Sequence, residues 1–226
     1  ALEMIATGRY SACLRAAEML EKGGAGLGLQ KAGTGATVAK DIDRATPLLQ
    51  VSDLKTHFDV STGFKALRTQ PAVVRAVDDL SFEIFRGETV GLVGESGCGK
   101  TTVDRTLLRL EEATAGRMVF EGADVTRAGG EQLQRYRRKV QVIFQDPYSS
   151  LNPRMTIGQI IAEPMLVYKL QPNRKSAHAR VRELLGQVGL FDYMAERYPH
   201  ELSGGQRQRV GIARALAMEP SFIVCD

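Results

Sequence analysis

Residues 89–101 read Thr-Val-Gly-Leu-Val-Gly-Glu-Ser-Gly-Cys-Gly-Lys-Thr, a short apolar run that leads directly into a glycine-rich turn. The turn fills the pattern G-x-x-x-x-G-K-[ST] at every fixed position. Beyond it, Val103, Leu107 and Leu110 recur at helical spacing, so the turn lies between a predicted buried strand and a predicted helix. In this context the pattern indicates a phosphate-binding loop rather than an ordinary glycine turn before a helix.

The residue types of this loop suit a nucleotide phosphate and its magnesium ion. Glycines let the backbone turn tightly and present its N–H groups to phosphate oxygens, and the helix start adds its positive dipole end. The Lys100 ammonium can reach the β- and γ-phosphates, and the Thr101 hydroxyl can ligate Mg²⁺. Cys98 occupies a variable position, and we assign it no redox role. The loop residues expected to contact the nucleotide are Gly94, Glu95, Ser96, Gly97, Cys98, Gly99, Lys100, Thr101 and Thr102.

The composition is that of a globular protein, with 226 residues of which 43% are apolar and 25% are charged. The net charge of +4 excludes a polybasic nucleic-acid-binding tail. Cys13, Cys98 and Cys225 are widely spaced and odd in number, which favours neither a disulfide framework nor a zinc site. Apolar runs fall short of the roughly 18 residues that a membrane span needs, and the N-terminus lacks an export-signal pattern.

Composition divides the chain into two regions. In residues 1–46 we expect a short helix from Ser11 to Lys22, followed by a flexible linker rich in Gly and Ala. Residues 47–226 alternate apolar β-type runs with helical patterns, which predicts an α/β fold. The predicted strands lie at 48–54, 73–84, 89–93, 140–144 and 222–225, and the later predicted helices at 174–189 and 206–218.

A phosphate loop alone leaves kinases, GTPases and many ATPases open, and a second motif narrows the choice. Residues 202–206 read Leu-Ser-Gly-Gly-Gln and precede a helical pattern. With this motif the chain resembles the ATP-binding cassette (ABC) family, in which LSGGQ is the signature that clasps the γ-phosphate of ATP held by the opposite subunit. The physical basis is again small residues, free N–H groups and a helix start facing an anion. The resemblance therefore implies that Ser203, Gly204, Gly205 and Gln206 bind nucleotide in trans.

Three further residues match positions that have a role in this family. Gln145 follows the predicted strand at 140–144 and matches the Q-loop glutamine, which approaches Mg²⁺ and the attacking water. Asp226 ends the predicted strand at 222–225 and matches the Walker B aspartate, which holds Mg²⁺ through water. Phe58 falls where the family places an aromatic ring against adenine, although a core phenylalanine would look the same. The resemblance thus implies a metal set of Thr101, Gln145 and Asp226.

The stretches at 142–154 and 197–206 are similar to the oligopeptide and dipeptide importer branch, which nickel and glutathione importers share. This implies a P-loop NTPase with a RecA-like parallel core, an antiparallel β subdomain and an inserted helical subdomain at about 147–201. It further implies a head-to-tail homo- or heterodimer of cassettes that binds ATP and Mg²⁺. Membrane permease subunits would contact the Q-loop and helical subdomain, and a solute-binding protein would take part indirectly. The expected location is the cytoplasmic face of the inner membrane.

The family's catalytic glutamate directly follows the Walker B aspartate, and this sequence ends at Asp226. The family's D-loop, switch histidine and a central strand of its core also lie beyond this position. Two alternatives therefore stay open beside a transport ATPase: a truncated nucleotide-binding remnant that does not hydrolyse ATP, and a soluble ABC protein acting on DNA or ribosomes. The second is disfavoured because the sequence has neither zinc CxxC pairs nor a second cassette.

Two basic clusters, at 135–139 and 174–182, could suggest nucleic-acid binding. Acidic neighbours such as Glu131 and Glu183, and the absence of a nucleic-acid reading motif, favour solvated helix faces instead. We therefore predict that nucleic acid is not a partner.

Overall fold

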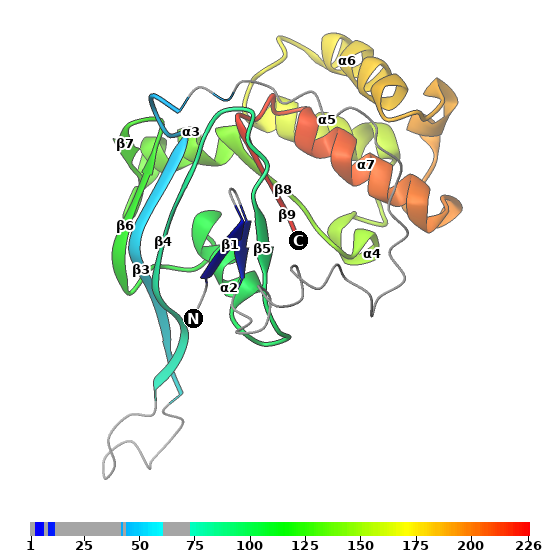
Figure 1. Ribbon diagram of the computed structural model, residues 1–226. Helices are drawn as coiled ribbons and strands as arrows, with labels where there is room; N and C mark the ends of the chain where they lie inside the picture. Colours follow the sequence, from blue (N-terminus) through cyan, green and yellow to red (C-terminus); the bar gives the residue numbers. More distant parts are fainter. Residues whose placement is uncertain (1–2, 7–8, 12–41, 43, 61–72) are drawn as a thin grey trace, which may run out of the picture. The chain divides into compact units, whose positions relative to one another are not determined.

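The computed structural model describes residues 3–6, 9–11, 42, 44–60 and 73–226, which fall into two compact units, Ala1–Ala128 and Gly129–Asp226 (Figure 1). The helix expected at 11–22 lies outside the described residues except for Ser11, which belongs instead to strand β2 (Arg9–Ser11). Most of the expected linker also lies outside them. The predicted organisation of residues 1–46 therefore stays a prediction.

The first unit contains a four-stranded antiparallel sheet with the order β4-β3-β6-β7. The sheet is formed by β3 (Leu49–Asp59), β4 (Val73–Ile84), β6 (Ala115–Phe120) and β7 (Ala123–Asp124). β3 and β4 form the long hairpin seen in Figure 1, with Leu49 opposite Ile84 at one end and Asp59 opposite Val73 at the other. Both strands were expected from their β-branched residues, whereas β6 and β7 were not.

The core of this unit lies between the antiparallel sheet and helix α2 (Lys100–Leu107). Leu49, Val51 and Leu54 of β3 are buried, and so are Val103 and Leu107 of α2. A hydrogen bond of 3.1 Å joins the hydroxyls of Thr56 in β3 and Thr106 in α2, and both residues are buried. This pair satisfies two buried polar groups and fixes the helix against the strand.

The strand before the glycine-rich loop is shorter and more exposed than expected. β5 spans only Gly91–Val93, and Val93 is 49% exposed. It pairs in parallel with β2, which in turn pairs with β1 (Glu3–Ala6), in a separate sheet of order β1-β2-β5. The prediction of a parallel strand is therefore correct, but its burial was overestimated because β5 is an edge strand of this sheet.

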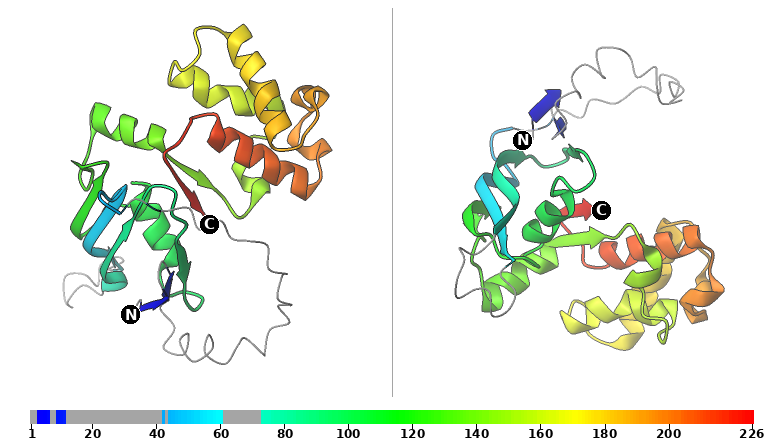
Figure 2. Two further views of the ribbon diagram at one scale, coloured as in Figure 1. Left: turned by 45° about the horizontal axis from the view of Figure 1, so that its top comes forward. Right: turned by 90° about the horizontal axis from the view of Figure 1, so that it is seen from below.

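The second unit contains a parallel pair, β8 (Val140–Ile143) and β9 (Phe222–Cys225), which lie side by side in Figure 2. Its helices are α3 (Gly130–Lys139), α4 (Pro147–Ser150), α5 (Ile157–Val167), α6 (Arg174–Gln187) and α7 (Gly204–Leu216), with short 3₁₀ turns η2 (Asp192–Glu196) and η3 (Pro199–Glu201). α6, α7, β8 and β9 agree with the sequence prediction to within a few residues. Among the described helices, none is both long and apolar enough to cross a lipid bilayer.

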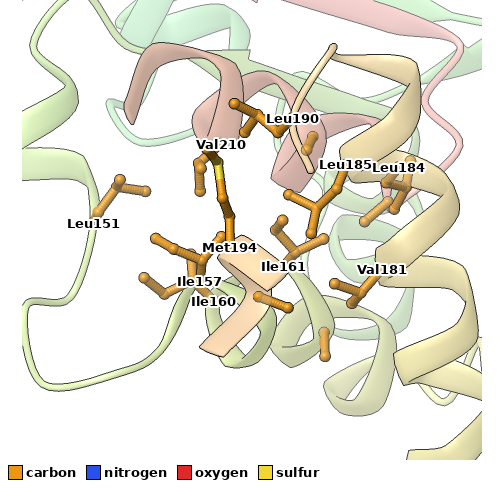
Figure 3. Packing of buried hydrophobic residues seen from close by; sticks show 14 of the residues in the cluster. Leu151, Ile157, Ile160, Ile161, Val181, Leu184, Leu185, Leu190, Met194 and Val210 are labelled. Atoms are coloured by element: carbon orange, nitrogen blue, oxygen red, sulfur yellow. The ribbon is translucent and has the colours of Figure 1, made fainter. Parts of the chain in front are cut away.

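Apolar side chains of α5, α6, α7 and η2 converge on one core. Figure 3 shows Ile161 of α5, Leu185 of α6, Met194 of η2 and Val210 of α7 pointing into the same interior. Each helix also has a defined start, since Thr156, Asn173 and Ser203 form capping boxes at α5, α6 and α7. One basic residue in each of α3 and α6 has an acidic partner on its own helix, in the pairs Arg135–Glu131 and Arg180–Glu183.

Protonation of Asp124 should lower the stability of the first unit toward unfolding. Hydrogen bonds from the Thr126 side chain and backbone, together with Arg117, lower the pKa of Asp124 from 3.8 to about 2. The folded state favours the ionised form of Asp124 more than the unfolded chain does. The ionised carboxylate therefore stabilises the folded state above about pH 4, and this stabilisation is lost as the pH falls toward 2. We expect Asp124→Asn to lower the urea midpoint at neutral pH, with a difference from wild type that narrows as the pH falls from about 4 toward 2. A difference that is constant over this range would contradict the assignment.

Candidate functional site

The glycine-rich loop connects β5 to the first turn of α2, as the sequence predicted. The N-cap of α2 is Gly99 in the left-handed region at φ 98°, and no side chain of the described residues caps this helix start. The first N–H groups of an α-helix have no partner within the helix, so they are available to an anionic ligand. Thr101 is exposed in this first turn and Thr102 is half-buried.

The Lys100 side chain contacts the backbone of the glycine-rich loop. Its ammonium donates hydrogen bonds to the carbonyl oxygens of Gly94 at 2.8 Å and Glu95 at 2.7 Å, and it lies 3.7 Å from the Cys98 sulfur. These bonds hold the positive charge against the backbone of the loop. A phosphate group could replace carbonyl partners with charged oxygens, which accept stronger hydrogen bonds from an ammonium.

Two glycines of the loop have positive φ for different structural reasons. Gly97 has φ 81°, and a Cβ built on it would meet nothing within 4 Å in the part of the chain that the structure describes. A Cβ on Gly99, by contrast, would overlap the carbonyl oxygen of Ala76 in β4. Gly97 is therefore needed for the turn alone, whereas Gly99 is also needed for the close contact between the loop and the antiparallel sheet.

Phe58 lies in β3, opposite Val74 of β4, and is 38% exposed. It belongs to the same unit as the loop and lies on the strand that Thr56 joins to α2. The ring is therefore not a core side chain, which removes one objection to the predicted adenine contact. The contact itself stays a prediction.

In the second unit, Gln145 and Asp226 lie at the carboxyl end of the parallel pair β8 and β9. Ile143 is opposite Cys225 at the carboxyl ends of β8 and β9, and the N–H of Asp226 donates to the carbonyl oxygen of Ile143 at 3.1 Å. Gln145 follows β8 by two residues, and both Gln145 and Asp226 are exposed. The carboxyl ends of parallel strands are where α/β proteins bind ligands, so this placement suits the predicted Mg²⁺-binding and water-positioning roles.

The LSGGQ residues form the start of α7. Ser203 is the N-cap, its hydroxyl accepts a hydrogen bond from the Gln206 N–H, and the Gln206 side chain accepts one from the Ser203 N–H at 2.9 Å. Gly204 and Gly205 are exposed, and a Cβ on either would meet no atom of the described residues within 4 Å. Packing against the described part of the chain therefore does not require the two glycines, which is consistent with an approach by another molecule.

These residues fit ATP and Mg²⁺ by the chemistry of their donors. The first unit offers N–H groups and one ammonium for phosphate oxygens, and the Thr101 hydroxyl for a metal. The second unit offers the oxygens of Gln145 and Asp226, which are ligands that Mg²⁺ accepts. The predicted site residues thus divide into two groups, one in each unit.

Comparison with known proteins identifies the class to which this fold and site belong. Residues 77–226 match the family described as ABC transporter. The chain belongs to this family, and the resemblance inferred from its motifs is confirmed.

Curated relatives place it near the peptide importers of that family. The chain is 54% identical over 180 residues to the oligopeptide transport ATP-binding protein OppF of Bacillus subtilis, covering 79% of this chain and 56% of that protein. It is 45% identical to OppF of Salmonella typhimurium, over 82% of this chain and 55% of that protein. It is also 50% identical to the glutathione import ATP-binding protein GsiA of Pectobacterium atrosepticum, over 80% of this chain and 29% of that protein. The chain spans about half the length of the two OppF relatives.

Solved structures confirm the predicted fold class. The ATP-binding cassette MJ0796, solved as a dimer in a post-hydrolysis state with ADP and Pi, aligns with a TM-score of 0.67 and 27% identity, over 79% of this chain and 73% of that one. The chain therefore has the α/β P-loop architecture expected from its motifs.

Sequence reasoning missed the residues that connect the two motifs of the second unit. Arg207 is buried and contacts both Tyr148 and Pro199. Tyr148 and Pro199 fall in stretches already recognised as similar to the importer branch, and Arg207 directly follows the second of them, but no spacing rule predicts that Arg207 contacts both.

Alanine substitutions at Gly97 and Gly99 should differ in cost. Both force alanine into a left-handed conformation, at about 1 kcal/mol or more. Gly99→Ala must in addition displace the Ala76 carbonyl, and steric overlap of this kind adds about 1–3 kcal/mol. We expect Gly99→Ala to lower the melting temperature several degrees more than Gly97→Ala does, measured by circular dichroism. Equal melting temperatures would show that the loop does not depend on its contact with β4.

Proposed function

We propose that this chain is the ATP-binding part of an importer for peptides or related small solutes, and that it binds and hydrolyses MgATP. The observation that carries the proposal is the presence, in one chain, of two glycine-containing helix starts with the sequences of a phosphate loop and an LSGGQ signature. The 54% identity to an oligopeptide transport ATP-binding protein supports the peptide class.

In this proposal each unit has its own part. The phosphate loop holds the triphosphate through its N–H groups and Lys100, and Phe58 stacks on adenine. Gln145 would orient the attacking water, and the residues that would hold Mg²⁺ are Thr101 of the first unit and Gln145 and Asp226 of the second. Bound Mg²⁺ would neutralise charge that develops on the phosphate oxygens.

The start of α7 would bind the ATP of a second cassette in a head-to-tail pair. The uncovered backbone at Gly204 and Gly205 supports this, because a small residue lets a phosphate approach N–H groups closely. We further propose that permease subunits dock on the helical subdomain at about 147–201 and the segment around Gln145. The chain would then lie peripherally on the cytoplasmic face of the inner membrane, and its solute would meet only the permease and a solute-binding protein.

The first test is the affinity of the phosphate loop for ATP. Lys100→Ala removes a charge-assisted contact of about 1.5–3 kcal/mol, so the dissociation constant for ATP should rise about ten- to a hundredfold. A titration with fluorescently labelled ATP measures it. Lys175→Ala, at an exposed lysine of α6, is the matched control and should bind like wild type. Unchanged affinity of the Lys100 variant would overturn the nucleotide site.

The second test separates binding in cis from hydrolysis in trans. Gly205→Asp places a carboxylate where the γ-phosphate of the partner's ATP is expected, so repulsion should abolish turnover while the affinity of the phosphate loop for ATP is kept. Gly186→Asp introduces the same residue at an exposed helical glycine of α6 with open space around it, and it should hydrolyse ATP normally. Measurements of steady-state phosphate release on the full-length protein compare the two. Wild-type turnover by Gly205→Asp would refute the role of the signature.

A further inference from the structure

Arg207 is a buried cation at the start of the signature helix. Only 6% of the residue is exposed, and its Nε donates a hydrogen bond of 2.6 Å to the carbonyl oxygen of Pro199. Its Nη1 is buried and has no hydrogen-bond partner among the described residues. A buried guanidinium is costly unless its surroundings compensate, so a position of this kind requires an explanation beyond stability.

The compensation comes from an aromatic ring on another element. The guanidinium carbon of Arg207 lies 3.8 Å from the centre of the Tyr148 ring, which is a cation–π contact at close range. Tyr148 belongs to α4, three residues after Gln145, and is itself 68% exposed. One face of the ring therefore covers a buried charge, while much of the residue is open to solvent.

Two further side chains of α7 bond to residues 144–150, the segment that contains Tyr148. Gln208 donates to the carbonyl oxygen of Phe144 at 3.5 Å, and Arg214 donates to that of Ser150 at 2.5 Å. Burial lowers the pKa of Arg214, and Glu163 partly offsets this effect. Residues 144–150 are thus attached to α7 at both ends and, through Tyr148, in the middle.

We propose that Arg207 is a positioning residue that transmits the position of Tyr148 to the loop before the signature and so to the start of α7. The same guanidinium lies over the Tyr148 ring and donates from Nε to the carbonyl oxygen of Pro199, and Pro199 begins the 3₁₀ turn that leads through Leu202 into Ser203. If a bound partner displaced the exposed Tyr148 ring, the Arg207 guanidinium would lose its cation–π contact. Its hydrogen bond to the Pro199 carbonyl would then change as well. Gln145 and the signature would then respond together.

Amide exchange tests this connection without nucleotide or partner. In the full-length protein, Tyr148→Ala should accelerate hydrogen exchange at least threefold in 199–202, where the amides of Glu201 and Leu202 bond to the carbonyls of Tyr198 and Pro199. Tyr148→Phe keeps the ring and should exchange like wild type. Because Tyr148 is exposed, both variants should fold. Unchanged exchange in 199–202 of Tyr148→Ala would overturn the proposal.

A double-mutant comparison shows whether Arg207 is the intermediary. Arg207→Gln should accelerate exchange in 199–202 by itself, and adding Tyr148→Ala should accelerate it no further. Arg209→Gln, two residues away on the same helix, removes an exposed arginine that bonds to Val188 and Gly189 and should leave 199–202 unchanged. Additive effects of the two substitutions would mean that Tyr148 and Arg207 act separately, and would contradict the proposal.

The consequence for turnover rests on the proposed ATPase function and is measured separately. Tyr148→Ala should lower kcat for ATP about five- to tenfold with KM for ATP within twofold, because the phosphate loop is untouched, and Tyr148→Phe should restore kcat. If wild type hydrolyses ATP and Tyr148→Ala matches it, the positioning role fails while the proposed function stands. If wild type does not hydrolyse ATP, the proposed function fails, and the exchange measurements alone decide the positioning role.

Discussion

The close contact between Gly99 and the Ala76 carbonyl is the constraint on which the nucleotide-binding unit depends. Only a residue without a Cβ allows the start of α2 to approach β4 this closely. The same approach places Thr106 against Thr56, so that the helix is fixed to the sheet by a buried hydrogen bond two turns further on. A loop whose geometry is fixed by two elements holds its N–H groups in place before any ligand binds, which reduces the ordering cost of binding.

The N-termini of α2 and α7 differ in how many of their first N–H groups have a hydrogen-bond partner. α2 begins at Gly99 with no side-chain cap from the described residues, so its first N–H donors are left for a ligand, and the Lys100 ammonium bonds to the loop carbonyls of Gly94 and Glu95. α7 begins at Ser203 with a complete capping box, which already satisfies the backbone N–H groups of Gln206 and Ser203 and fixes the Gln206 side chain. A phosphate at α7 would therefore meet fewer free donors than one at α2. This asymmetry supports the proposal that the loop holds the nucleotide and that the start of α7 contributes to the nucleotide site of a second cassette.

Much of this arrangement was predictable from the sequence because the motifs carry their own backbone requirements. The positions of β3, β4, β8, β9, α6 and α7 follow from apolar periodicity and from the residues that end each run. α5 was missed because Pro164 interrupts the pattern and argues for a helix end, although Ile157, Ile160 and Ile161 are buried at helical spacing. The burial of β5 was misjudged because a short apolar run reads the same at a sheet edge as at its centre.

The contacts of Arg207 could not have been read from the sequence for a different reason. An arginine after LSGGQ normally reads as an exposed residue of a helix, but here Tyr148 of α4 and Pro199 of η3 contact it and it is buried. Arg207 and Arg214 are seven residues apart, which places them on one face of α7 two turns from each other. That face contacts Tyr148 and Ser150, while Val210 and Ala213 pack into the apolar core. α7 thus contacts the rest of its unit in two ways. Its apolar surface packs into the core, and Arg207 and Arg214 join it to the segment after β8. Because Arg207 lies one turn into α7, the proposed connection from Tyr148 reaches the helix at the end that carries the signature.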